Sequence, residues 1–142
     1  MDLRRFAVRI TGIGKGVEVN AGKMVRRVTL AVDGSVVIAT PVDTGRARSN
    51  WIAEIGGPAQ GVRSAYVEGK EGSTAGPNAQ RAIEQARAVV AQYKTGDTVH
   101  ITNNLPYIGR LNDGWSAQAP AGFVQTSVLQ GIEQVQSTRL ID

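Results

Sequence analysis

The stretch from residue 103 to 122 constrains the fold most, because its concentration of turn residues suits neither a helix nor an interior strand. Its sequence is N-N-L-P-Y-I-G-R-L-N-D-G-W-S-A-Q-A-P-A-G. The prolines remove backbone donors and the glycines permit dihedral angles closed to other residues. So long a connection in a compact domain usually carries function. We expect Tyr107 and Trp115 to clamp this loop onto a sheet; the alternative is a structural loop whose two rings plug the sheet's end.

Length and composition indicate one ordinary globular domain spanning residues 1–142. The chain has no cysteine, which excludes disulfides, a thiol nucleophile and a cysteine metal site. No run of about 18 apolar residues is present, so we expect no membrane span. Arg9 and Lys15 interrupt any hydrophobic signal core, so we expect a soluble protein without a signal peptide.

The positive charge is concentrated in the first third of the chain. Residues 1–51 hold nine Lys and Arg against four Asp and Glu, a net charge of +5, whereas residues 52–142 carry −1. A basic segment of this kind is compatible with binding to nucleic acid or to an acidic protein surface. The alternative is a solvated helix face, because the sequence contains no long cationic run.

Three segments have the apolar spacing of amphipathic helices. The first covers residues 17–40, with Arg26, Arg27 and Asp33 on faces other than the apolar one, and Pro41 sets its end. The second covers residues 78–94 and is closed by Gly96. The third begins near Pro120, which suits a first helical turn, and has an apolar stripe of Val124, Val128, Ile132 and Val135.

Three further segments have the alternation of strands. Residues 46–55 follow a tight turn at 40–46, in which Asp43 is placed to accept hydrogen bonds from following amides, and they predict a half-buried strand with Trp51 inward. Residues 62–67 predict a second, weaker strand, and residues 97–103 a third. The glycine-rich segment 68–77 lacks large apolar anchors, so we expect a mobile loop there.

The first sixteen residues give two readings. Phe6, Val8 and Ile10 alternate with polar or small residues as in a short strand, but a short helix ending at the following glycines is equally compatible. Lys15 is followed by Gly16 and not by Ser or Thr, so the segment is not a phosphate-binding loop. Together the segments predict an α+β domain: a small, mainly antiparallel sheet packed with a long N-terminal helix, a middle helix and a C-terminal helix.

The sequence offers little for catalysis. His100 is the only histidine and lies in a strand predicted to be half-exposed, which favours a surface role over a general base. Ser49 has no histidine near it in sequence, and the turn chemistry around Asp43 and Asp113 explains them better than a carboxylate pair does. We therefore expect no enzyme activity, no metal and no cofactor.

Two motifs together resemble one family. The segment T-P-V-D-T-G-R-A-R-S-N-W at 40–51 and the stretch at 103–122 resemble the neck, tail-completion and head–tail joining proteins of tailed bacteriophages. The order is similar too: a long helix, the P-V-D-T-G-R turn, a variable loop, a helix, then N-x-x-P-Y and G-W-S-x-Q-A-P-x-G before a final helix. The match runs from about Val17 onward, and residues 1–16 match little.

The resemblance implies a virion structural protein, assembled in the host cytoplasm, in the ring that joins head to tail. We expect a ring of identical subunits, hexameric, whose neighbours are head–tail connector and tail-tube proteins and whose channel passes DNA. Arg46 and Arg48, outward on the first strand, would serve the interface. The alternative function is a small basic nucleic-acid-binding module. The expected interface and motif positions are Asp43, Thr44, Gly45, Arg46, Arg48, Trp51, Asn103, Asn104, Pro106, Tyr107, Arg110, Asn112, Gly114, Trp115, Gln118 and Pro120.

Overall fold

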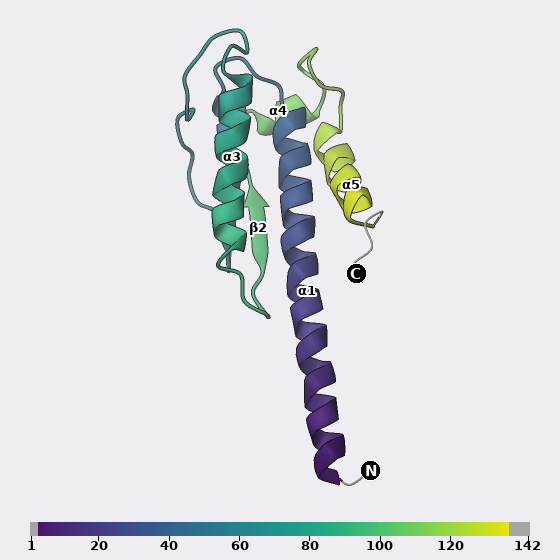
Figure 1. The fold of residues 1–142 in the computed structure, drawn as a ribbon. Helices are drawn as coiled ribbons and strands as arrows, with labels where there is room; N and C mark the ends of the chain where they lie inside the picture. The colour runs from purple at the N-terminus through teal and green to yellow at the C-terminus, as the bar shows by residue number, and fades with distance from the viewer. Residues whose placement is uncertain (1–2, 137–142) are drawn as a thin grey trace.

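The protein is an α+β domain in which helices pack against a two-stranded antiparallel sheet (Figure 1), so the predicted fold class is confirmed. The computed structural model describes residues 3–136, with side chains from residue 20 onward. In chain order the elements are α1 (Leu3–Ala39), α2 (Arg46–Ser49), β1 (Ile52–Ile55), α3 (Ala75–Val90), β2 (Val99–Thr102), α4 (Ile108–Asn112) and α5 (Phe123–Gln136).

Helix α1 is one continuous helix of 37 residues, and α3, β2 and α5 all contact it. Both readings of residues 1–16 are therefore wrong from Leu3 onward. The glycines there weaken helix propensity, but they keep their amide donors, so hydrogen bonding can continue through them. The first half of α1 extends away from the body (Figure 1). The helix ends at Ala39, two residues before Pro41, as predicted.

Strands β1 and β2 pair antiparallel, from Ile52 opposite Thr102 to Ile55 opposite Val99. The strand predicted at 97–103 is confirmed as β2. The strand predicted at 46–55 is confirmed only from Ile52. Before it the chain makes the helical turn α2, because Gly45 has a φ of 89° and its carbonyl accepts hydrogen bonds from both the amide and the hydroxyl of Ser49.

The strand predicted at 62–67 does not form, because side chains rather than another strand satisfy its backbone. Buried Asn50 accepts from the amide of Arg63 at 2.8 Å and donates to its carbonyl at 2.9 Å. Buried Asn78 bonds the amide and carbonyl of Val67 in the same way, at 2.9 and 2.8 Å. Two asparagines thus take the place that a neighbouring strand would occupy.

Helix α3 begins earlier and ends earlier than the predicted helix at 78–94. Residues 75–77 form its first turn, where Pro77 needs no hydrogen-bond partner for its missing donor, and the helix ends at Val90. The glycine-rich loop is correspondingly shorter than the predicted 68–77. Its residues Glu71 and Gly72 donate backbone hydrogen bonds to Asp43. Its mobility stays a prediction.

The core lies where α1 and α3 meet Trp51, just before β1. It consists of Val36, Val37, Trp51, Ala79 and Ala82. The alanines of α3 let the two helices approach closely. Trp51 is buried as predicted, and its indole nitrogen donates to the hydroxyl of Thr40 at 2.8 Å. This bond joins the C-terminal end of α1 to the start of β1.

Asp33 contradicts its predicted place on a non-apolar face, because it is fully buried with an exposed fraction of 0%. Neither of its carboxyl oxygens has a hydrogen-bond partner among the described residues. Burial, which removes water from the carboxyl group, raises the pKa of Asp33 from 3.8 to about 7. The helix prediction rests on the spacing of apolar residues, and that spacing does not indicate which polar residue is buried.

Helix α5 makes the most extensive contacts with α1, through a stripe one residue away from the predicted one. Its buried residues are Phe123, Ser127, Gly131 and Val135; of the predicted stripe only Val135 is fully buried. Pro120 lies before the helix, not in its first turn. A methyl group on Gly131 would lie 2.7 Å from the Cα of Val32, so the two backbones touch. Small residues therefore determine where α5 sits.

We expect Gly131→Ala to destabilise the domain by about 1–3 kcal/mol, because the added carbon overlaps the backbone of α1. Gly34→Ala is the matched control, since Gly34 lies within α1 and a methyl there meets nothing within 4 Å. That variant should gain up to about 1 kcal/mol from helix propensity. Urea denaturation of both variants measures the difference, and equal effects would contradict the close α1–α5 contact.

Candidate functional site

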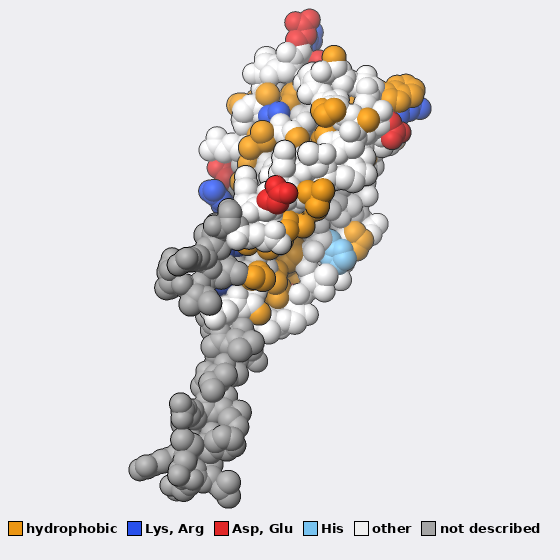
Figure 2. Space-filling model, turned by 90° about the vertical axis from the view of Figure 1, so that its right-hand side faces the viewer, with side chains coloured by type: hydrophobic (Ala, Val, Ile, Leu, Met, Phe, Trp, Pro, Cys, Tyr) orange, Lys and Arg blue, Asp and Glu red, His pale blue; other side chains and the backbone are white. Residues whose placement is uncertain are grey.

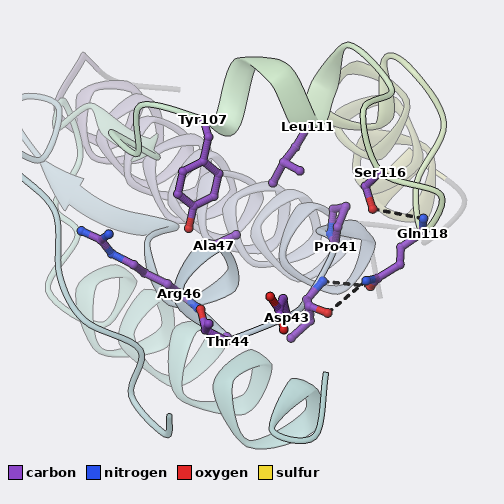
Figure 3. Close-up of a pocket in the computed structure, with 11 residues that line it drawn as sticks. Pro41, Asp43, Thr44, Arg46, Ala47, Tyr107, Leu111, Ser116 and Gln118 are labelled. Carbon is purple, nitrogen blue, oxygen red and sulfur yellow. Dashed lines mark hydrogen bonds between the residues drawn. The ribbon is translucent and has the colours of Figure 1, made fainter. Parts of the chain in front are cut away.

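The segments 40–51 and 103–122, distant in sequence, form one structural unit. The side chain of Gln118 bridges the backbone of Val42, accepting from its amide at 2.9 Å and donating to its carbonyl at 3.0 Å (Figure 3). Between the segments lies an open pocket of about 310 Å³. It is lined by Pro41, Val42, Asp43, Thr44, Gly45, Arg46, Ala47, Tyr107, Leu111, Ser116 and Gln118.

Tyr107 forms one wall of this pocket. The ring is half-buried and points from the start of α4 toward the turn at Ala47 (Figure 3). Burial raises the pKa of the Tyr107 hydroxyl, and the positive charge of Arg46 partly opposes this effect. Tyr107 thus anchors its loop to the rest of the protein, as predicted. Its contact, however, is with the turn in the 40–51 segment and not with the sheet.

Trp115 contradicts the other half of the clamp, because 72% of its surface is exposed. The guanidinium of Arg110 lies 5.3 Å from the centre of the indole ring. Backbone contacts close the loop instead: the amide of Gly122 donates to the carbonyl of Asn112 at 2.6 Å, and Gly114, with a φ of 91°, packs against Ala121. Trp115 and Arg110, which we call the Trp115 platform, therefore project from a loop that is held without them.

The 103–122 stretch also contains the short helix α4, so the expectation that it would form no helix is wrong. Helix α4 begins two residues after Pro106, where the missing amide interrupts no helical bond. The side chain of Asn112 at its end accepts from the amide of Val124 at 3.0 Å and so supports the start of α5. Pro106 and Pro120 are exposed and make no side-chain hydrogen bonds.

Arg46 and Arg48 are not outward-facing strand residues. Arg48 donates to the carbonyls of Ile38, Thr40 and Ala75 at 2.7, 3.0 and 3.1 Å. It therefore caps the C-terminal end of α1, where a positive charge is favourable. Partial burial lowers the pKa of Arg48 from its usual value. Arg46 donates to the carbonyl of Arg63 at 3.4 Å. Both arginines hold the turn in place.

The turn itself is bonded across the chain. The carboxylate of Asp43 was predicted to accept from the amides that directly follow it. It accepts instead from the amide of Glu71, at 2.9 Å. Thr44 accepts from the amide of Arg46 at 3.4 Å. Gly45 is required for two reasons: its φ is positive, and a methyl group there would overlap the amide of Asn78.

Two predicted site asparagines also have structural partners. Asn103 donates to the carbonyl of Ala47 at 3.0 Å, and Asn104 donates to the carbonyls of Ala59 and Gly61 at 2.7 and 3.2 Å. The sequence analysis missed three further side chains that bond the backbone of distant segments: Asn50, Asn78 and Gln85. Nothing in the local pattern distinguishes a buried asparagine from an exposed one, so no sequence signal was available for them.

The described residues offer no group of three or more His, Asp or Glu side chains that could hold a metal ion. His100 is half-buried and lies opposite Glu54 in the sheet. None of the helices described is long and apolar enough to cross a membrane. Comparisons of the chain with protein-family models, with curated proteins and with solved structures give no match.

Proposed function

We propose that this protein is a structural subunit of the ring at the head–tail junction of a tailed bacteriophage or prophage. Its partners in this proposal are further copies of itself and the adjoining connector and tail-tube proteins, and its location is the virion. The proposal rests on the two motifs that resemble neck and tail-completion proteins, which remain an argument from sequence.

One structural observation supports reading the two motifs together. The Gln118–Val42 hydrogen bonds join them across 76 residues, and both contribute to one pocket. Motifs that serve unrelated purposes need not meet in this way. The unit holds a rigid turn on one side and the Trp115 platform on the other, and exposed tryptophan and arginine are frequent anchors of protein interfaces.

The alternative function, a basic nucleic-acid-binding module, has less support. Lys23, Arg26, Arg27, Arg46 and Arg48 are the basic residues of the 20–51 segment. Arg26 donates to the carbonyls of Val90 and Tyr93, and Arg46 and Arg48 bond the carbonyls described above. Three of these five cations therefore already serve the fold. Binding to phosphates would weaken steeply with salt, whereas assembly through apolar contacts would not.

We expect the free energy of unfolding of Trp115→Ala to lie within about 0.5 kcal/mol of the parent value, because the ring is exposed. We expect the same variant to lose assembly, because Trp115 anchors the proposed interface. Leu129→Ala is the matched control, since Leu129 is 61% exposed on α5 and outside both motifs. Light scattering coupled to gel filtration, with and without added tails, measures assembly. A Trp115→Ala variant that assembles like the Leu129→Ala variant would contradict the role of the platform.

The same assay tests the function itself. The parent protein should form closed rings alone or on the surface of tails or connectors, at both low and moderate salt. A folded protein that stays monomeric under all of these conditions and binds neither tails nor connectors would refute the proposal.

A further inference from the structure

The two edges of the sheet differ in how far side chains cover them. The amide of Gly56 donates to the carbonyl of Thr98 at 2.8 Å, so these two residues form a hydrogen-bonded pair. Bonded and non-bonded pairs alternate along an antiparallel ladder, which makes Ala53–Ile101 and Ile55–Val99 the non-bonded pairs. Ala53 therefore directs its amide and carbonyl away from β2, and the side chain of Gln85 bonds both, at 2.9 and 2.8 Å. A helix side chain thus covers the outward groups of Ala53 on the β1 edge, whereas those of Ile55 have no partner among the described residues.

No described side chain bonds the outer edge of β2 in this way. By the same phase, Val99 and Ile101 direct their amides and carbonyls away from β1. Among the described residues, none of these four groups has a hydrogen-bond partner. The strand sequence Val-His-Ile-Thr contains no proline and no lysine, which commonly protect an edge from pairing with another chain.

A second open edge lies in residues 61–65, which we call the outer segment. Residues 62–65 form no turn or helix, and Asn50 bonds the amide and carbonyl of Arg63 on the inner side. Because successive groups of an extended chain alternate sides, Val62 and Ser64 face outward. The amide and carbonyl of Val62 and the amide of Ser64 have no partner among the described residues, and 48% of Val62 is exposed.

The outer segment begins close to the end of β2, where Asn104 donates to the carbonyl of Gly61 at 3.2 Å, but the two edges do not pair. In Figure 1 the connection between β1 and α3 runs along the side of α3 that faces away from β2, so α3 separates it from β2 in that view. His100 of β2, the chain's only histidine, is visible on the face shown in Figure 2, beside a band of hydrophobic side chains. Within one copy the two edges are not hydrogen-bonded to each other among the described residues, so each is available to a second copy.

We propose that β2 of one copy accepts the outer segment of the next copy as an added strand. The contact joins two different surfaces, so its repetition produces a closed ring when the rotation between copies closes. Main-chain hydrogen bonds would supply the pairing, and Val99, Ile101 and Val62 would supply apolar contact. This inference rests on the proposed ring and names the interface that builds it.

A second copy is the occupant that the chain itself supports. Both edges present unpaired main-chain groups, beside Val99 and Ile101 in β2 and beside Val62 in the outer segment. A two-stranded sheet is marginal by itself, and a third strand from a neighbour would complete it. An extended peptide from a different protein is the competing occupant, and it would leave the outer segment without a role.

The test uses two variants that each block one edge. Val99→Pro removes one outward amide of β2 and leaves the ladder bonds of Thr98 and His100 intact, and Ser64→Pro does the same in the outer segment. We expect each variant alone to lose ring formation by about tenfold or more. An equimolar mixture should form one-to-one dimers and nothing larger, because each variant retains one intact edge. Native mass spectrometry of the parent, the variants and the mixture measures this.

Val99→Lys and Val62→Lys replace the proline variants if circular dichroism finds either of them unfolded. Val67→Lys is the control, because Val67 is 37% exposed while Asn78 bonds its amide and carbonyl. Parental ring yield in both edge variants, or a mixture that stays monomeric, would overturn the strand addition and leave the proposed function standing. A parent protein that never assembles, alone or on tails, would overturn the proposed function as well.

Discussion

Replacing Asp33 by Asn should make the domain markedly more stable at pH 8 and leave it nearly unchanged at pH 4. Asp33 is fully buried without a hydrogen-bond partner, and its pKa is raised from 3.8 to about 7 by loss of hydration. The folded state therefore keeps a proton that the unfolded chain releases between these two values. Asparagine has nearly the same shape and carries no charge at any of these pH values.

The direction of the pH effect follows from the raised pKa. Below pH 3.8 both states of the parent hold the proton, and the buried acid costs no extra stability through ionisation. Stability then falls as the pH rises toward 7, where the folded state also begins to lose its proton. The full loss is about 4 kcal/mol, at 1.36 kcal/mol for each pKa unit.

Denaturant unfolding of the parent and of Asp33→Asn between pH 4 and pH 8 measures this. Arg26 lies on the same face of α1 as Asp33, but its guanidinium is bonded to the carbonyls of Val90 and Tyr93 and does not pair with the carboxyl. Asp113→Asn is the control, since it makes the same chemical change at an exposed position. An Asp33→Asn variant with the parental slope would show that the carboxyl is hydrated in solution.

Asn78→Ala should be the most damaging single truncation among the turn and loop contacts. Its carbonyl oxygen accepts from Ser49 and Val67, and its amide donates to Val67 and Thr74. Alanine would leave several of these buried groups unpaired, at about 1–3 kcal/mol each. We expect a total loss of about 3 kcal/mol or more, which lowers the melting temperature by about 10 °C in a domain of this size.

Gln80→Ala in the same helix is the control. Gln80 is exposed and its amide reaches only Glu84, at 3.2 Å, so the change should stay within about 0.5 kcal/mol of the parent. Scanning calorimetry of both variants compares them. If the two melted alike, Asn78 would not be holding the segment between β1 and α3, and the explanation given for the missing strand at 62–67 would fail.

The sequence predicted the elements whose signals are local. Helical spacing located α3, α5 and the second half of α1, and alternation located β2. Pro41 set the end of α1 correctly because the effect of proline on the preceding residue depends on covalent geometry alone. The buried position of Trp51 followed from its place in an alternating run, although the run became a strand only from Ile52.

The failures share a different cause. Asn50 and Asn78 replace a strand pairing through contacts between distant segments, so the pattern at 62–67 was read as a strand that does not form. The positions of Pro106 and Gly114, each directly before an aromatic residue, predict that Trp115 anchors the loop, whereas backbone contacts already close it. Gly131 shifted the buried stripe of α5 because two helix backbones touch there. Each outcome depends on a tertiary neighbour that spacing cannot reveal.

Gold labelling of assembled particles tests the central claim most directly. Antibodies raised against the purified protein would be applied to intact virions and to separated heads and tails, and the gold particles located by electron microscopy. The proposed function predicts label at the junction between head and tail, and at one end of separated tails or at the connector. Label distributed along the tail tube, label on free DNA, or particles without label would contradict it.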